Sequence, residues 1–292
     1  MGRQKHFDVS GINIRVHTQH EAQEYVKLWG ELHKTRSYVV HANNALMIGD
    51  VRYEDKENPE ALISGNFYRF LEVDLDNPWF NIEKHKKATE EDVVQVNIPI
   101  ELKPNLTEIP YVFNPKNHCL YFISKAGGAA TSPRMVHKLL TTLCKSDQIM
   151  EQFKKVDLTI LTDKGKVDEM LNWPEIRSLT IRIERPNPVD HEDEQLIFER
   201  LQNRRVESET TTYKKASGEV SIIPDQQMKD LAHIAANNGI VEVVGKNLQR
   251  SPDRATSSDF PLKIKGIYNS KLQPLLDALK AVILNIGRND KL

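Results

Sequence analysis

The chain has only two cysteines, no long apolar run and almost no net charge, and each shortage excludes a class of protein. Cys119 and Cys144 are too few for a disulfide framework and lack CxxC spacing, which predicts reduced thiols and no structural zinc. No stretch approaches the roughly 18 consecutive apolar residues of a membrane span. The opening residues, MGRQKHFDVSG, also lack the apolar middle of a signal peptide. We therefore expect a cytoplasmic protein with no membrane partner.

The chain also lacks the glycine-rich motifs that hold nucleotides, since GxGxxG and GxxxxGK[ST] are both missing. The nearest approach is AGGAATSPRMVHKLL, from Ala126 to Leu140, where two glycines precede a helix start without a lysine. A glycine turn, a cap from Ser132 and Pro133 at the first helical position explain this stretch. The sequence predicts a structural strand-to-helix turn and no cofactor.

The charge that is present is unevenly distributed. The 292 residues carry a net charge of −1, which argues against a uniformly basic coat. Residues 51–100 hold 6 Lys/Arg against 11 Asp/Glu, whereas residues 201–292 hold 14 against 10. A basic face in the C-terminal part is therefore compatible with a neutral total.

Hydrophobic periodicity predicts a mixed α+β fold of two packed halves, with mainly antiparallel sheets and helices packed on one face. The first half, residues 1–117, should contain a strand at 7–17 with Gly11 as a bulge, a helix at 20–34 and a meander of three strands. Its proline-rich end should form irregular connections and edge strands, VVQVNIPI and IPYVF, because proline interrupts a ladder.

The second half, residues 118–292, should alternate strands and helices. Strands are expected at 120–124, 156–162, 178–186, 206–215, 241–245 and 261–268, and helices at 132–145, 166–172, 190–204, 225–239 and 270–287. Alternation in SLTIRIERP indicates a strand with one wet face. The last helix has a broad apolar face that should pack on its own sheet or, alternatively, form a dimer contact or hold a protein partner.

Catalytic signals are sparse. There is no HExxH, no GxSxG and no zinc spacing, and Cys144 lies in a predicted helix with the spacing of a buried residue. The acidic run Asp190–Glu194 fits a helix start, where carboxylates favour the macrodipole. A metal-dependent nuclease or toxin would need another carboxylate, such as Asp157, Asp163 or Glu184. No metal site and no catalytic residue are predicted, and the nuclease stays an alternative.

Clustered basic residues in the last third give the stronger functional indication. The candidates are Arg204, Arg205, Lys214, Lys215, Lys246, Arg250 and Arg254. If the sheet brings them together, they form a stripe that neutralises the phosphates of DNA or RNA. The structural alternative is that Arg204 and Arg205 complement the C-terminus of a helix, while the lysines keep an edge strand soluble.

The order of elements, with TSPRMVHKLL and RSLTIRIERPNPVDHEDE, resembles a family of bacterial and prophage proteins of unknown function. In layout only, it is similar to the Rex exclusion protein of phage lambda. This resemblance implies a DNA-binding dimer acting in phage exclusion and transfers no site residue. We therefore expect a non-enzymatic, weakly sequence-selective nucleic-acid-binding protein that forms a homodimer.

Overall fold

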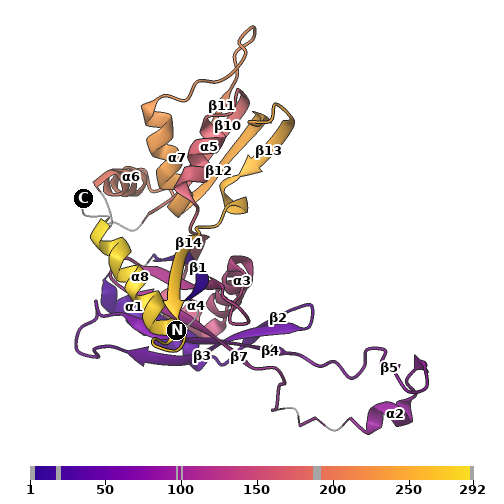
Figure 1. The fold of residues 1–292 in the computed structure, drawn as a ribbon. Coiled ribbons are helices and arrows are strands. Elements are labelled where there is room, and N and C mark those ends of the chain that lie inside the picture. Colours follow the sequence, from indigo (N-terminus) through magenta and orange to yellow (C-terminus); the bar gives the residue numbers. More distant parts are fainter. Residues whose placement is uncertain (1–3, 18–20, 97, 100, 187–191, 290–292) are drawn as a thin grey trace.

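The chain folds into two lobes, each built on one antiparallel sheet (Figure 1). The computed structural model describes residues 4–17, 21–96, 98–99, 101–186 and 192–289. The first lobe contains a seven-strand path, β14-β1-β8-β7-β4-β3-β2, with β9 also paired to β1. The second lobe contains the order β11-β10-β12-β13. The mixed α+β class with mainly antiparallel sheets is therefore confirmed.

The first lobe takes its elements from both ends of the chain. Its strands are β1 (Gln4–Val16), β2 (Tyr38–His41), β3 (Asn44–Tyr53), β4 (Ile63–Leu71), β7 (Thr107–Asn114), β8 (Cys119–Lys125), β9 (Val156–Ile160) and β14 (Ile264–Asn269). Its helices are α1 (Ala22–Lys34), α3 (Pro133–Cys144), α4 (Asp147–Phe153) and α8 (Leu275–Asn289). Between β4 and β7 the chain leaves the sheet and forms β5 (Phe80–Asn81), β6 (Lys86–Lys87) and α2 (Glu90–Val94).

The second lobe is inserted between β9 and β14. Its strands are β10 (Glu175–Glu184), β11 (Ser208–Lys214), β12 (Gly239–Lys246) and β13 (Pro252–Thr256). Its helices are α5 (Lys164–Leu171), α6 (Glu192–Asn203), α7 (Gln226–Asn238) and the short η1 (Ser257–Asp259). Residues of α5, α6 and α7 share one hydrophobic core with Leu179, Ile181, Val241 and Val243. These helices therefore cover a single face of the four-stranded sheet.

Local sequence signals explain the helix starts. The Ser132 hydroxyl accepts a hydrogen bond from the Met135 amide, and Pro133 occupies the first turn of α3, as predicted. In α1, Tyr25, Leu28, Trp29 and Leu32 are buried at helical spacing. The meander β2-β3-β4 and the strand-to-helix turn after β8 are likewise confirmed.

The apolar face of the last helix packs within its own lobe. Ala278, Leu279 and Ile283 are buried in the first core, and α8 contacts β7, β8 and β14. No helix among the described residues is both long and apolar enough to cross a membrane.

Several local predictions are wrong, and each has a physical cause. In VVQVNIPI, Val93 and Val94 end α2, and the described residues 95–96 and 98–99 form no edge strand, because Thr89 caps a helix here in a reciprocal bond pair with Asp92. IPYVF forms β7, which is central and not at an edge. Pro110 is tolerated there because the ladder with β8 runs only from Tyr111 to Asn114.

Two further corrections concern β1 and the predicted polar loop 246–254. The bulge in β1 falls at Asp8 and Val9, not at Gly11. Gly11 lies close to the Leu161 side chain, and a Cβ there would lie 2.6 Å from the Leu161 Cδ1 and force that side chain to shift. The end of the polar loop pairs as β13, which places Arg254 on a strand. The predicted division at residues 117 and 118 stays a prediction; this position is the turn between β7 and β8.

Candidate nucleic-acid interface

Strand register gathers most of the predicted basic residues at one end of the four-stranded sheet. Lys214 lies opposite Ser178, Ser178 opposite Val244, and Val244 opposite Arg254, so that one row crosses all four strands. Lys246 ends β12 at the same end, and Arg250 lies in the β12–β13 turn. We call this region the cationic end; it consists of Arg177, Lys214, Lys215, Lys246, Arg250 and Arg254.

Acidic neighbours partly neutralise the cationic end. Lys246 Nζ lies 2.5 Å from Glu175 Oε2, and Arg254 donates to Glu242 at 2.6 Å. The hydrogen bond from Lys246, and then that from Arg177, lower the pKa of Glu175, so it stays ionised. With Glu219 and Asp253 included, four acidic residues lie among the six cations of this region. A positive excess therefore remains, but it is moderate.

Three cations of this region interact least with the acidic residues: Lys214, Lys215 and Arg250. Lys214 and Arg250 are exposed and form no ion pair among the described residues. The Lys215 ammonium donates to the carbonyl oxygens of Ala216 and Glu219, which are neutral acceptors. Such cations are available to phosphates.

Arg204 and Arg205 do not belong to the cationic end. They follow α6, and β11 then begins at Ser208, which lies opposite Glu184 at the other end of the sheet. The seven residues of β11 separate the two ends by roughly 20 Å. Arg204 also pairs with Glu209 at 3.2 Å. The structure therefore brings five of the seven predicted residues together and places two elsewhere.

The face of this sheet that the helices leave uncovered is mainly polar, with Ile240 and Val244 as its apolar residues. It carries a group of hydroxyl side chains: Ser178, Thr180, Thr210, Thr212 and Thr256. Arg182 is exposed on the same face, and the described strand residues there include no aromatic side chain. Sequence reasoning did not name Arg177 or Arg182 as candidates, although the alternation in β10 indicated a wet face.

A second polar cluster lies where the two lobes meet, around Arg15 of β1. Its guanidinium donates to Glu184 Oε2 at 2.6 Å and to Asn238 Oδ1 at 3.5 Å, and the side chain is 1% exposed. Asn13 donates to Asn238, which in turn donates to Glu194 Oε1 at 3.1 Å. Burial lowers the pKa of Arg15, while the nearby carboxylates oppose this change. The cluster therefore joins β1 to β10, α6 and α7.

The same cluster contains three carboxylates that the nuclease alternative would use. Asp157, Glu184 and Glu194 do converge, but on the Arg15 guanidinium. Asp163 instead caps α5 by accepting from the Gly165 amide. Among the described residues, no three His, Cys, Asp or Glu side chains are grouped so as to hold a metal ion. Asp190 and His191, and the side chains of Glu192 and Asp193, lie outside the described residues.

Asp157 makes the stability of this junction pH-dependent. Burial would raise its pKa, but the hydrogen bond from His17 at 2.7 Å and the charges of His17, Arg15 and Lys155 lower it to about 2. An unfolded aspartate titrates near pH 3.9. The stabilisation from Asp157 is therefore complete above about pH 4 and is lost as the pH falls toward 2.

We expect urea unfolding between about pH 5 and 2 to show a loss of roughly 2 kcal/mol attributable to this group. Asp157→Asn should lower stability at neutral pH and flatten that part of the profile. A variant whose profile parallels the natural chain would contradict this assignment.

The glycine turn after β8 presents acceptors and not donors. The Arg69 guanidinium donates to the carbonyl oxygens of Gly128 at 2.8 Å and Ala130 at 2.5 Å. A phosphate cradle needs inward-pointing amides instead. Gly127 has a φ of 51°, which favours glycine. These contacts give the turn a structural role between β8 and α3.

Cys144 is unsuited to nucleophilic chemistry. Its side chain is buried in the first core, and burial raises the pKa of its thiol to about 12. The reactive thiolate is therefore absent at neutral pH.

A comparison with known protein families gives a match that extends over nearly the whole fold. A family described as a domain of unknown function (DUF4747) matches residues 5–284, which include both lobes. The chain belongs to the DUF4747 family. The prediction of a family of unknown function is thus confirmed, whereas the resemblance to the Rex exclusion protein stays a prediction. No curated protein matches this DUF4747 chain.

Proposed function

We propose that this chain is a non-enzymatic protein that binds the nucleic-acid backbone, with weak sequence selectivity, through its cationic end. The observation that carries the proposal is the strand register, which aligns Lys214 with Arg254 across four strands. Neighbouring strands are about 4.8 Å apart, so this row spans roughly 14 Å. Measured along the axis of a DNA duplex, that length corresponds to about four base-pair steps.

The uncovered face of the sheet supports weak selectivity. Threonine and serine hydroxyls contact phosphates and sugars without reading bases. Sequence-tolerant stacking on single strands requires aromatic side chains, and the described strand residues of this face have none. Binding should therefore depend on phosphate charge and be steeply salt-dependent.

We place this activity in a bacterial cytoplasm, in phage defence or exclusion. The similarity in layout to the Rex exclusion protein supports this setting. A homodimer would hold two cationic ends on one nucleic acid and raise the apparent affinity through a high effective concentration.

The test is a fluorescence anisotropy titration of double-stranded DNA, single-stranded DNA and RNA over a salt series. The variant Lys214→Glu/Lys215→Glu should weaken binding at least tenfold near 100 mM salt, about 1.4 kcal/mol or more. It should also reduce the slope of log affinity against log salt by about 1–2, since each lost phosphate contact lowers that slope by about 0.9. Comparing the three ligands distinguishes DNA from RNA.

The matched control is Arg204→Glu/Arg205→Glu, which makes the same charge change at the other end of the sheet. Affinity and salt slope should change little in the control. If both double variants lose binding equally, the loss reflects net charge, and the assignment of the cationic end as the binding site is wrong. If neither changes the titration, the proposed contact is absent.

The nuclease alternative gains no support from Asp157, Glu184 and Glu194, which surround Arg15. Incubating the chain with DNA and RNA, with and without Mg²⁺ or Mn²⁺, separates the two functions. Our proposal expects intact nucleic acid in every condition. Metal-dependent cleavage that an Arg15 variant retains would instead place a nuclease site outside the Arg15 cluster.

A further inference from the structure

Residues 72–106, which we call the arm, leave the first lobe after β4 and return to it at β7 (Figure 1). None of the described arm residues belongs to either hydrophobic core. Yet Phe80 is 64% exposed, Ile82 78% and Val94 80%. Large apolar side chains gathered on one protruding segment mark an interaction surface. The arm therefore needs a partner surface that accepts apolar side chains.

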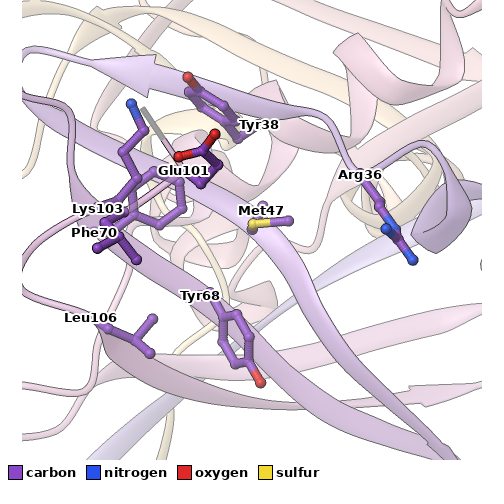
Figure 2. Close-up of a pocket in the computed structure, with 9 residues that line it drawn as sticks. Arg36, Tyr38, Met47, Tyr68, Phe70, Glu101, Lys103 and Leu106 are labelled. Atoms are coloured by element: carbon purple, nitrogen blue, oxygen red, sulfur yellow. The ribbon is translucent and has the colours of Figure 1, made fainter. Parts of the chain in front are cut away.

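The first lobe carries such a surface beside the base of the arm. Tyr38, Met47 and Tyr68 form one row across β2, β3 and β4, and Phe70 follows on the same face. These side chains line a groove of about 480 Å³, which Leu102 and Leu106 border (Figure 2). Tyr38 is 40% exposed. No described segment fills the groove, and a hydrophobic hairpin tip matches its character.

Charges on the two surfaces are complementary. Lys86 and Lys87 are exposed on β6, next to Phe80 and Asn81 of the paired strand, and form no ion pair among the described residues. Arg36, Glu101 and Lys103 line the groove, and Glu108 lies opposite Tyr68 on β7. Since Glu72 pairs with Lys103, Glu101 and Glu108 stand against one further cation, Arg36. Both acids are exposed. An arm seated in the groove would bring two lysines to two carboxylates at its rim.

The base of the arm is already bound to its own chain beside this groove. Lys103 pairs with Glu72 at 2.5 Å, and the Leu71 amide donates to the Pro104 carbonyl. The part of the arm that contains Phe80 and Ile82 extends away from the sheet (Figure 1). A second copy related by a two-fold axis would offer its arm to this groove and receive this arm in return, which closes the assembly.

We propose that the chain forms a homodimer by reciprocal arm exchange, in which Phe80 and Ile82 of each copy occupy the groove around Met47 of the other. This inference is independent of nucleic-acid binding, since neither the arm nor the groove includes a residue of the cationic end.

Sedimentation equilibrium over a concentration series tests the proposal. The natural chain should be dimeric at micromolar concentration, and Phe80→Glu/Ile82→Glu should weaken dimerisation by roughly 30-fold or more, the effect of losing an interface hot spot. Leu284→Glu is the matched control, because Leu284 is a 55% exposed apolar residue on α8. This control should remain dimeric. A monomeric natural chain, or a dimer that the arm variant leaves unchanged, would overturn the proposal.

Cross-linking identifies the contact directly. Chains with Ile82→Cys and chains with Met47→Cys, mixed under mild oxidation, should form a disulfide only between unlike chains. The doubly substituted chain shows whether an arm instead folds onto its own groove. An intrachain disulfide without covalent dimers would refute exchange, as would no cross-link in the mixture. Circular dichroism confirms that each variant is folded.

Discussion

Replacing Arg15 by methionine should lower the free energy of unfolding by about 3–5 kcal/mol, because it leaves the partly buried Glu184 and the buried Glu194 without their cation. The Arg15 side chain is 1% exposed and donates to Glu184 at 2.6 Å. Glu194, 6% exposed, is bound through Asn238. Methionine preserves much of the side-chain volume, so the loss would reflect charge and hydrogen bonding more than a cavity. Equilibrium unfolding in urea measures it.

Arg52→Met is the matched control for this measurement. Arg52 pairs with Asp50 at 2.7 Å, but its side chain is 60% exposed. An exposed pair contributes about 0–1 kcal/mol. If Arg15→Met costs no more than Arg52→Met, the junction cluster does not hold the lobes together. Adding Glu184→Gln to Arg15→Met should recover part of the loss, because it removes one of the unpaired charges.

Trp29→Ala should destabilise the chain by about 3–5 kcal/mol, because it opens a large cavity in the first core. The indole is fully buried, stacks on Phe113 with ring centroids 4.9 Å apart, and donates to the Tyr111 hydroxyl at 3.2 Å. The substitution thus removes packing and leaves a buried hydroxyl without its donor. The midpoint of thermal unfolding should fall by several degrees.

Trp79→Ala provides the control with the same chemical change. Trp79 lies in the arm and belongs to neither hydrophobic core. We expect a loss below about 1 kcal/mol, because few core contacts depend on it. A loss as large as that of Trp29→Ala would mean that the arm is an integral part of the folded body, contrary to its role as an exchanged segment.

The basic cluster illustrates how far residue patterns predict the candidate site. Sequence reasoning named seven cations, and five of them gather because Lys214 and Arg254 share one row of the sheet. Arg204 precedes the same strand as Lys214 by only a few residues, yet it lies at the opposite end. Residues at the two ends of one strand are close in the sequence but far apart in space, because each residue advances the chain by about 3.3 Å.

Arg15 shows the opposite limit. In β1 the alternating residues Val9, Ile12, Ile14 and Val16 indicate one buried face, and such a pattern usually places Asn13 and Arg15 in water. Both are buried instead, because the second lobe covers that face through Asn238 and Glu184. Neither partner can be identified locally, since they lie more than 160 positions away along the chain.

The sequence alone determined what depends on near neighbours: the cap at Ser132, the buried stripe of α1, the meander and the mixed α+β class. These features follow from backbone preferences and periodicity within a few residues. The tertiary structure alone decided the rest: the row from Lys214 to Arg254, the central place of β7, the burial of Arg15 and the protruding arm. Strand pairing and lobe packing join residues distant in the chain, so no local pattern specifies them.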